Sequence, residues 1–425
     1  MQPGRDETDT AAAVDPGSLI LVTGASGYIG GRLVSRLLEA GYRVRCLART
    51  PAKLDAAPWR SDVEVVEGAI EGDLDAAVDG VDAVYYLVHS IGEGPGWTER
   101  EASGAANLRD AAGRAGVRRI IYLGGLGGTD GESLSPHLRS RHRVGEVLAD
   151  GPVPVTELRA AVIIGSGSAS FEMLRYLVEV LPMMVTPRWV ATRCQPIAVR
   201  DVLRYLVDVL GKPATAGRIL EVGGPDGLTY REMMSIYAEE AGLRARIVVP
   251  VPVLTPRLSS LWVGLVTPLP TSLARPLVDS LVNEVVVNDD DITTLCPGPR
   301  LTYRESVRRA LSITQAHQVT TSWSGSANLP IGQTRQYMAT ATYISTGSCS
   351  GKVIDVSNRA AWSALPGSVT SVSAAGLVTG LAVGTATINA TYKSQTDATP
   401  PTLAVVAVTL KSLAFSPSGT ITTQV

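Results

Sequence analysis

Residues 23–30 read Thr23-Gly24-Ala25-Ser26-Gly27-Tyr28-Ile29-Gly30, and they follow a short apolar run at Leu19–Val22. After this loop, apolar residues recur at helical spacing, as expected for an amphipathic helix: Ile29, Leu33, Leu37 and Leu38. Gly24 permits the tight turn out of the strand, Gly27 lets a diphosphate approach the backbone, and Gly30 lets the helix pack closely on the sheet. The order of strand, glycine-rich turn and helix therefore predicts a dinucleotide-binding loop.

Short β-branched runs alternate with helical stretches over residues 18–315. The runs that we interpret as strands are Leu19–Val22, Arg43–Ala48, Val63–Glu67, Ala83–Val88, Arg119–Leu123 and Val155–Leu158. This alternation predicts right-handed crossovers and a parallel sheet that is covered by helices on both faces. The predicted fold class is an α/β Rossmann fold with a doubly wound parallel sheet.

The end of the second predicted strand indicates which nicotinamide cofactor is bound. An acid at this position would bind the 2′-hydroxyl of NAD, but the chain has Arg49, followed by Lys53. A guanidinium at this place can pair with the 2′-phosphate of NADP, so we expect NADP, with NAD as the alternative. The alternative interpretation of Arg49 is a solvated loop charge. The predicted cofactor-binding residues are Thr23, Gly24, Ser26, Gly27, Tyr28, Ile29, Gly30, Arg49, Lys53, Leu87 and His89.

Composition narrows the range of partners. The formal net charge is −2, from 38 basic and 40 acidic residues, which argues against a nucleic-acid partner. The four cysteines are far apart and form no CxxC or Cys/His cluster, so we expect buried, reduced thiols and no metal site. The first residues are polar without an apolar signal region, which favours a cytoplasmic location. Prolines and charges interrupt the apolar stretch Leu258–Val287, so we predict no membrane span, and a buried or lipid-facing surface helix stays open there.

The composition changes near Ser324. Asp and Glu become rare, and Arg335–Tyr343 alternates with period two. Further short strands are expected at Leu377–Leu381, Gly384–Tyr392 and Leu403–Leu410. Short strands at regular spacing predict an all-β sandwich, with no residues for chemistry.

These observations divide the chain into five parts. Residues 1–17 are a predicted disordered leader, residues 18–315 the Rossmann domain with a substrate-cleft part, and residues 316–325 a linker. Residues 326–411 form the predicted β-sandwich, and residues 412–425 the start of a second, truncated repeat. The repeat is suggested by the similarity of residues 323–329 to residues 415–421.

The loop resembles that of the atypical and extended short-chain dehydrogenase/reductase superfamily, TGxxGxxG. Supporting segments are residues 81–88, Asn107, residues 196–202 and residues 221–225. The chain is similar to epimerase-like NAD(P)H-binding proteins, to the Rossmann accessory subunit of respiratory complex I and to NmrA-like redox sensors. This resemblance implies hydride transfer or nucleotide sensing.

The chain departs from the catalytic pattern of that superfamily, a Ser after strand five and Tyr-x-x-x-Lys on the next helix. Strand five ends in Gly124-Gly125, without a serine. By position, His137 replaces the tyrosine and Arg141 replaces the lysine. An imidazole can act as an acid or base near neutral pH, whereas Arg stays protonated. We therefore predict His137 and Arg141 as catalytic candidates, and a ribose-contacting or surface histidine remains the alternative.

The tail is similar to bacterial immunoglobulin-like group 2 domains of intimin and invasin-type surface proteins. The matching segments are residues 329–334, Trp362, residues 372–381 and residues 384–388. The resemblance implies an immunoglobulin-like sandwich that serves as a spacer or an adhesive module.

Three functions stay open on the sequence. The first is an NADP(H)-dependent oxidoreductase that acts on a carbonyl or quinone-like small molecule. The second is a non-catalytic NADP(H) sensor or assembly factor, for which the cofactor is a regulatory nucleotide. The third is an adhesive or structural protein dominated by the tail, whose protein partner the sequence does not indicate.

Overall fold

The computed structural model describes residues 13–89, 96–128, 134–186, 188–250, 279–314, 317–324, 326–343, 353–358, 360–392, 395–407, 413–415 and 421–423. The chain divides into two compact units, residues 1–310 and 311–425. Each unit has its own hydrophobic core, so each is described by itself.

The first unit is built on a parallel sheet of seven strands in the order β11-β6-β5-β4-β1-β2-β3. The strands are β1 (Leu19–Thr23), β2 (Arg43–Ala48), β3 (Glu64–Glu67), β4 (Ala83–Tyr86), β5 (Arg119–Gly125), β6 (Val155–Ala160) and β11 (Ile219–Val222). Every neighbouring pair is parallel. The order reverses between β1 and β4, which is the crevice where doubly wound sheets bind their ligands. The predicted α/β Rossmann fold is confirmed.

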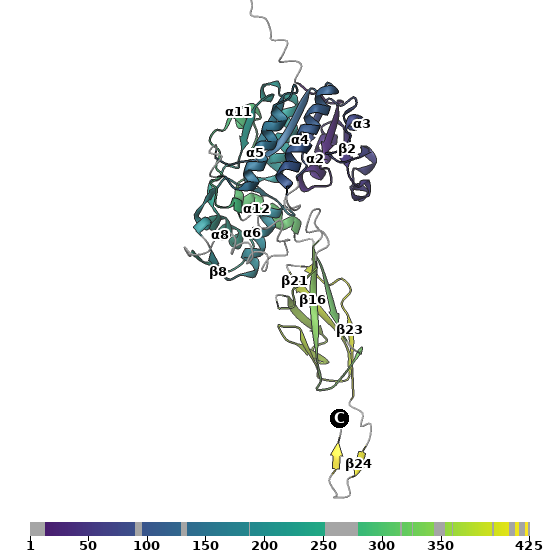
Figure 1. The fold of residues 1–425 in the computed structure, drawn as a ribbon. Helices are drawn as coiled ribbons and strands as arrows, with labels where there is room; N and C mark the ends of the chain where they lie inside the picture. Colours follow the sequence, from purple (N-terminus) through teal and green to yellow (C-terminus); the bar gives the residue numbers. More distant parts are fainter. Residues whose placement is uncertain are drawn as a thin grey trace, which may run out of the picture. The chain divides into compact units, whose positions relative to one another are not determined.

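Helices cover both faces of this sheet (Figure 1). On one face pack α2 (Tyr28–Glu39) and α7 (Val199–Asp208). On the other face pack α4 (Trp97–Arg114) and α5 (Pro136–Ala149). Strand residues such as Tyr85 and Tyr86 are therefore buried on opposite sides, as two-sided burial of a parallel sheet requires.

The remainder of the first unit lies after β6 and carries short elements. Its helices are α6 (Ala169–Val180), α8 (Tyr230–Glu240), α11 (Asp291–Leu295) and α12 (Tyr303–Thr314). The short helix α3 (Asp75–Val78) lies earlier in the chain, between β3 and β4. Two-stranded pairs join β7 (Ile163–Ile164) to β10 (Ile197–Ala198), β9 (Arg193–Cys194) to β12 (Leu228–Thr229), and β8 (Met183–Thr186) to β13 (Ile247–Pro250). The short 3-10 turns are Pro51–Leu54, Arg60–Asp62, Arg188–Ala191, Val209–Gly211 and Pro213–Thr215. Thr229 and Glu232 form a capping box at the start of α8.

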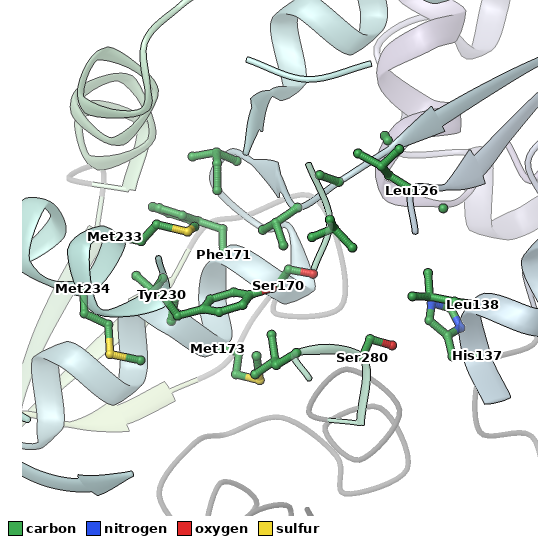
Figure 2. A pocket seen from close by; sticks show the side chains of 18 of the residues that line it. Leu126, His137, Leu138, Ser170, Phe171, Met173, Tyr230, Met233, Met234 and Ser280 are labelled. Carbon is green, nitrogen blue, oxygen red and sulfur yellow. The ribbon is translucent and has the colours of Figure 1, made fainter. Parts of the chain in front are cut away.

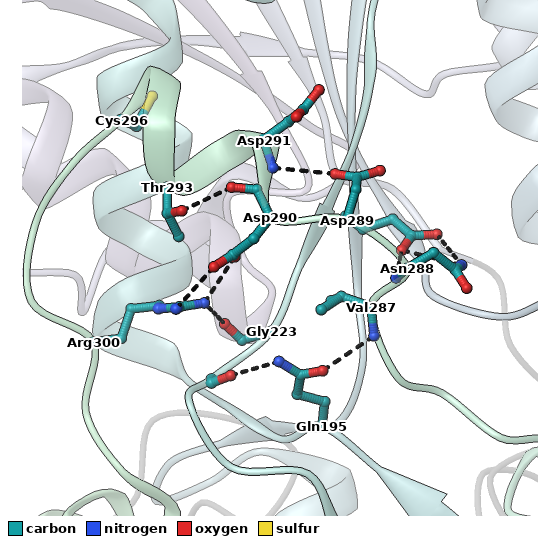
Figure 3. A network of polar contacts seen from close by, with 12 residues as sticks. Gln195, Gly223, Val287, Asn288, Asp289, Asp290, Asp291, Thr293, Cys296 and Arg300 are labelled. Carbon is teal, nitrogen blue, oxygen red and sulfur yellow. Dashed lines mark hydrogen bonds and ion pairs between the residues drawn. The ribbon is translucent and has the colours of Figure 1, made fainter.

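A polar network holds residues 285–301 against the end of the sheet (Figure 3). The amide of Gln195 donates to the carbonyl of Gly224 and accepts from the backbone N–H of Val287. Arg300 makes two hydrogen bonds to the carboxylate of Asp290, at 3.0 and 3.1 Å, and a third to the carbonyl of Gly223. Because a planar guanidinium matches a carboxylate in a fixed geometry, this pair fixes the path of the segment.

The second unit is a sandwich of two sheets. One sheet has the order β14-β16-β20-β19, with β17 on β16, and the other has β15-β23-β21-β18, with β22 on β21. The first sheet contains β14 (His317–Trp323), β16 (Thr334–Tyr343), β17 (Val353–Asp355), β19 (Thr370–Val372) and β20 (Leu377–Gly380). The second contains β15 (Asn328–Pro330), β18 (Ala361–Leu365), β21 (Gly384–Tyr392), β22 (Gln395–Thr396) and β23 (Thr402–Val406). The predicted immunoglobulin-like sandwich is confirmed.

Two predicted boundaries need correction. The described end of the leader is ordered: Val14 is fully buried, and its carbonyl accepts a hydrogen bond from the hydroxyl of Tyr42. An apolar side chain amid polar residues thus joins the core, while residues 1–12 lie outside the described residues. In addition, residues 317–323 of the predicted linker form β14, which pairs with β16 from His317 to Trp323. The strand was overlooked because its sequence is mostly polar.

The structure also differs from the sequence analysis at the edge of the sheet and at the end of the chain. The sequence did not indicate β11, a four-residue edge strand. At the end of the chain, β24 (Leu413–Phe415) and β25 (Ile421–Thr423) form an antiparallel pair, whereas a second truncated repeat stays a prediction. Most of the apolar stretch 258–287 lies outside the described residues. In the part that is described, no helix combines the length and the apolarity that a bilayer crossing needs.

Candidate cofactor site and active site

The glycine loop connects β1 to α2 with very little free space. Gly24 has φ +76°, and a Cβ there would lie 2.7 Å from the carbonyl oxygen of Leu87. A Cβ on Gly30 would lie 2.2 Å from the carbonyl oxygen of Gly24. Only glycine fits these two positions, so the backbone of the turn carries no side chain at either of them.

Thr23 supports this loop from beneath. Its hydroxyl donates to the carbonyl of Tyr85 at 2.9 Å and accepts from the N–H of Leu87 at 3.1 Å. The side chain is fully buried and does not line the cavity described below. The hydroxyl of Thr23 thus joins β1 to the end of β4, and a contact of Thr23 with the cofactor stays a prediction.

The N-terminus of α2 opens at this loop. Gly27 is the N-cap and provides no side-chain hydrogen bond to the first turn. The first N–H groups of a helix have no partner within the helix and carry a partial positive charge. This end of α2 is thus suited to a diphosphate.

A cavity of about 800 Å³ extends along the carboxyl ends of the strands. It brings together every predicted cofactor or catalytic residue except Thr23: Gly24, Ser26, Gly27, Tyr28, Ile29, Gly30, Arg49, Lys53, Leu87, His89, His137 and Arg141. Among the described residues of its lining, the charged ones are Arg49, Lys53 and Arg141, against Glu71. An excess of cations and a glycine cradle that a Cβ would fill both suit a dinucleotide with its phosphates.

The two ends of this cavity differ in chemistry. At one end, Arg49 follows β2, and Lys53 lies in the 3-10 turn Pro51–Leu54. At the other end, His89 follows β4, while His137 and Arg141 lie on α5. Because the glycine loop lies between them, a dinucleotide whose diphosphate rests on the loop would place its adenosine near Arg49 and its nicotinamide near the histidines.

The two histidines form a pair at that end. The ring centroids of His89 and His137 are 5.1 Å apart, with 33° between the ring planes. Arg141 donates to the carbonyl of Leu123, and its guanidinium lies 5.2 Å from the ring centre of Tyr122. Arg141 is thereby anchored to β5 and holds a positive charge beside both rings.

A buried carboxylate stands behind His89. Oε1 of Glu101 lies 2.6 Å from Nδ1 of His89, and Oε2 accepts a hydrogen bond of 2.6 Å from the hydroxyl of Ser140. The sequence analysis missed Glu101, although a signal existed: the residue lies four before Ala105 on the buried stripe of α4. An acid at a core position of an amphipathic helix needs a partner, and here the partners are His89 and Ser140.

Both imidazoles are neutral at physiological pH. Burial, with the charge of Arg141, lowers the pKa of His89 to about 4, although Glu101 acts in the opposite direction. Burial lowers the pKa of His137 to about 3, and repulsion from His89 in its protonated form and from the charge of Arg141 acts in the same direction. Nε2 of His89 and Nδ1 of His137 have no hydrogen-bond partner among the described residues.

A second cavity of about 120 Å³ adjoins the first (Figure 2). Its described walls are formed by aliphatic, aromatic and sulfur-containing side chains, among them Phe171, Met173, Met233 and Met234, and no charged side chain belongs to the part of the lining that the structure describes. His137 lines both cavities, as do Gly125, Ala160, Ala161 and Ser170. The smaller cavity is therefore an apolar pocket next to the polar end of the larger one.

The absence of the usual serine after strand five has a steric counterpart. A Cβ on Gly125 would lie 2.8 Å from Cδ2 of Leu138, and a Cβ on Gly124 would lie 2.6 Å from Oε1 of Glu157. Side chains from α5 and β6 thus occupy the space that a serine would need.

Three polar residues of the strands and turns after β5 lie away from both cavities. Arg159 pairs with Glu157 at 2.8 Å, Gln195 belongs to the network of Figure 3, and Arg193 is exposed on β9. None of them lines either cavity. Asn107 donates to the carbonyls of Ile70 and Gly72, which is a structural role.

The cysteines behave as expected where they are described. Cys46, Cys194 and Cys296 are free and buried, and Cys349 lies outside the described residues. Within the described ranges, no three His, Cys, Asp or Glu side chains gather as metal ligands would.

Comparison with known proteins agrees with the two units. The family described as NAD(P)H-binding matches residues 24–163, and the bacterial Ig-like domain (group 2) family matches residues 319–403. Fold and site thus define an NAD(P)H-binding Rossmann protein with a bacterial immunoglobulin-like domain.

The relatives define the family more closely. A (4-alkanoyl-5-oxo-2,5-dihydrofuran-3-yl)methyl phosphate reductase of Streptomyces griseus is 32% identical over 224 residues, which cover 50% of this chain and 71% of the relative. A 3β-hydroxysteroid dehydrogenase/Δ5→4-isomerase of Mycobacterium tuberculosis is 34% identical over 139 residues, 28% of this chain and 36% of the relative. The chain belongs to the NAD(P)H-binding family of epimerase-like short-chain dehydrogenases and reductases.

Solved structures show the same fold. An NADPH-dependent quinone oxidoreductase of Escherichia coli, complexed with NADPH, superimposes with a TM-score of 0.56 at 20% identity, covering 68% of this chain and 98% of that one. The triphenylmethane reductase of Citrobacter sp., complexed with NADP(H), gives a TM-score of 0.54 at 22% identity, covering 68% and 99%.

Proposed function

We propose that this protein is an NADP(H)-dependent reductase of a carbonyl or quinone-like small molecule that carries an apolar, uncharged group. The observation that carries the proposal is the junction of the two cavities at His137. One cavity has the cations and glycines of a dinucleotide site, and the other has the walls of an apolar binding pocket. A bound cofactor and a bound substrate would meet at this junction.

Binding of the cofactor is assigned to the loop and to the cations. The N–H groups at the start of α2 would hold the diphosphate, and Arg49 with Lys53 would hold the 2′-phosphate. The NADPH complexes of the quinone oxidoreductase and the triphenylmethane reductase, which share the fold, support NADP(H) over NAD(H). When bound, NADPH supplies a hydride to the substrate.

The chain's own residues orient the substrate and exclude water. Phe171, Met173 and the two methionines of α8 offer soft, adaptable walls to an apolar group. A cavity near 120 Å³ is comparable with apolar cavities that accept a single benzene ring. His137 at the junction is the predicted group that contacts the reacting oxygen, and Arg141 supplies a positive charge beside it.

A substrate panel tests this function. Purified protein is mixed with NADPH and with quinones or aldehydes, and the loss of nicotinamide absorbance is followed. We expect turnover of benzaldehyde-sized, uncharged compounds, and a markedly higher KM for 4-carboxybenzaldehyde because a carboxylate would have to leave water for an apolar pocket. Equal turnover of the neutral and the charged aldehyde would show that the apolar pocket does not bind the substrate.

A second function has its own support. Gly124 and Gly125 replace the catalytic serine, and His137 and Arg141 replace the tyrosine and lysine. These changes favour a non-catalytic NADP(H) sensor or assembly factor that binds the nucleotide as a regulator. Tight NADPH binding without turnover of any member of the panel would favour this function.

The location and the tail belong to the same proposal. A cytoplasmic site of action agrees with the use of NADP(H). The immunoglobulin-like unit is proposed as a spacer or adhesive module, and the proposed chemistry is assigned to the first unit.

A further inference from the structure

Glu101 and His89 are arranged as a carboxylate–imidazole pair that neither the motif nor the family comparison assigns. Glu101 is 6% exposed on α4, and both of its oxygens have a partner at 2.6 Å. Ser140 on α5 occupies one oxygen, which leaves Oε1 directed at Nδ1 of His89. The carboxylate, itself on α4, is thus held by a residue of α5 and by a residue that follows the end of β4.

This contact sets the tautomer of His89. A carboxylate oxygen can only accept hydrogen bonds, so Nδ1 of His89 must carry the hydrogen. The ring is neutral, because burial and Arg141 disfavour the imidazolium. Nε2 is then an unprotonated acceptor, and the described residues provide no donor for it.

The groups around His89 agree with this assignment. Glu101 on α4 faces Nδ1, the ring of His137 on α5 lies 5.1 Å from that of His89 between centroids, and the charge of Arg141, also on α5, disfavours the imidazolium. Arg141 is anchored to the carbonyl of Leu123 and offers no lone pair to the ring. His89 also lines the large cavity at its proposed nicotinamide end.

We propose that His89, oriented by Glu101, accepts the proton of a substrate hydroxyl at Nε2 in alcohol oxidation. In the reductive direction, Nε2 first takes up a proton from solvent and then passes it to the carbonyl oxygen that receives the hydride. This inference rests on the proposed function. In alcohol oxidation, the O–H bond breaks and its proton forms an N–H bond at Nε2. The hydrogen on the carbinol carbon leaves with its electron pair for oxidised nicotinamide, so the alcohol is oxidised to a carbonyl and the nicotinamide is reduced.

Glu101 is the positioning residue of this pair. When Nε2 takes up a proton, the ring becomes an imidazolium, and a carboxylate 2.6 Å from Nδ1 stabilises that charge. His137 has no such carboxylate among its described contacts, and His89 itself lowers the pKa of His137. His89 is therefore better placed than His137 to hold the proton.

The tautomer can be measured without any turnover. In ¹⁵N NMR spectra of the full-length protein at pH 7, with and without NADP⁺, we expect Nδ1 of His89 to be protonated and Nε2 to be unprotonated. In Glu101→Gln, the amide can donate to Nδ1, which favours the opposite tautomer. A wild-type His89 with a proton on Nε2, or an imidazolium at pH 7, would overturn the inference. The wild-type spectrum decides even if Glu101→Gln does not fold.

Activity provides the second readout. We expect His89→Ala and Glu101→Gln to lower kcat by about 100-fold or more while the Kd for NADPH changes by less than about threefold, the range of a lost general base. Ser140→Ala keeps the His89–Glu101 contact and is expected to lose about tenfold or less. His142→Gln, which retains a donor toward the carbonyl of Gly125, serves as the control histidine outside the site.

The outcomes separate the two proposals. If the wild type turns over no substrate, the proposed function fails. The NMR measurement of the His89 tautomer still tests whether Glu101 orients His89. If the wild type is active and His89→Ala keeps its kcat, the inference fails and the proposed function stands. Loss of activity in His137→Ala with full activity in His89→Ala would assign the proton to His137.

Discussion

At the scale of single residues, the cofactor preference depends on the side chains that follow β2. Arg49 and Lys53 line the cavity there, and Glu71 is the acid in the same lining. NADPH differs from NADH by one phosphate, so the two cations have a defined target. A charge-assisted hydrogen bond to such a group contributes about 1.5–3 kcal/mol.

Arg49→Ala is therefore expected to weaken NADPH binding by about 10- to 100-fold, the equivalent of that free energy. NADH binding should change by less than about threefold, because NADH lacks the phosphate. Calorimetric titration of both nucleotides into wild type and variant measures the two values. Arg36→Ala, which removes an exposed cation paired with Glu39 on α2, is the matched control. An equal loss for NADPH and NADH would show that Arg49 does not recognise the 2′-phosphate.

The glycines act at the same scale through space rather than charge. In Gly30→Ala, the new methyl group would lie 2.2 Å from the carbonyl oxygen of Gly24, so α2 would have to move away from the loop. We expect loss of NADPH binding and a destabilisation of about 1–3 kcal/mol, as for other overpacked sites. Gly211→Ala, where the new Cβ meets nothing within 4 Å, is the control and should leave both quantities unchanged. Thermal unfolding and calorimetry measure them, and intact NADPH binding by Gly30→Ala would contradict the assigned loop.

The two histidines give a pH dependence of stability whose sign follows from their pKa values. Those of His89 and His137, about 4 and about 3, lie below the ordinary 6.5. Between pH 6.5 and pH 4, the unfolded chain binds protons that the folded chain does not. Their contribution to stability is complete above pH 6.5 and is lost as the pH falls toward 4.

His89→Gln is expected to reduce the slope of the unfolding free energy against pH by at most about 1.4 kcal/mol per pH unit in this window. Urea unfolding at pH 5, 6 and 7, followed by the amide NMR signals of β5, measures the slope in the first unit. An unchanged slope would mean that folding does not lower the pKa of His89. His317, the histidine of the second unit, provides the control variant His317→Gln.

At the scale of elements, the strongly periodic segments could be predicted and the short ones could not. The range Arg43–Ala48 is the same in sequence analysis and structure, and α2 follows the predicted apolar stripe. In contrast, β11 has four residues at the sheet edge, where one exposed face weakens the apolar signal. β14 is polar because pairing with β16, rather than burial of every side chain, holds it.

In the candidate site, too, some features could be predicted from the sequence and others could not. The glycine loop could be predicted because its conformation restricts the residue type at fixed spacing. The pairing of Glu101 with His89 could not, since it depends on how α4 and α5 pack on the sheet. The apolar pocket likewise combines β6, α6, α8 and residues 280–285, which no local pattern connects.

The segment after residue 279 supplies one wall of that pocket through Ser280, Leu281 and Val285. The path of this segment depends on the ion pair between Arg300 and Asp290. The guanidinium of Arg300 also donates to the carbonyl of Gly223. We expect Arg300→Ala to increase hydrogen exchange at Val285 and Val287 and to raise the KM for an apolar aldehyde by about 3- to 10-fold, with little change in NADPH affinity.

Asp290→Ala should have the same effect, and the double variant should lose little more, because the two residues act as one contact. Arg218→Ala breaks a more exposed pair with Asp291 in the same segment and is the matched control. Additive effects of Arg300→Ala and Asp290→Ala would mean that each residue acts through separate partners.

At the scale of the whole molecule, the two units have separate cores, and the boundary determines whether each can fold alone. Helix α12 ends at Thr314, and β14 begins at His317. β14 contributes the buried Val319 to the second core, and the N–H of Thr321 donates to the buried carboxylate of Asp397. Its seven residues pair along β16, which otherwise pairs with β20 only through Thr334–Gln336 and with β17.

A fragment of residues 317–425 is therefore expected to unfold cooperatively, whereas a fragment of residues 326–425 should lose the transition or several kcal/mol of stability. Removal of β14 takes away the backbone donor to Oδ2 of Asp397 and exposes one edge of β16, a ten-residue strand of the sandwich. Replacing residues 317–323 by a Gly/Ser segment of equal length separates the effect of the strand from that of chain length, and this variant should behave like the shorter fragment. Residues 1–314 should bind NADPH with the affinity of the full chain, since every residue of both cavities lies before residue 286. Circular dichroism during heating and calorimetry measure these outcomes. If the fragment of residues 326–425 is as stable as that of residues 317–425, β14 does not stabilise the second unit and residues 317–323 act only as a linker.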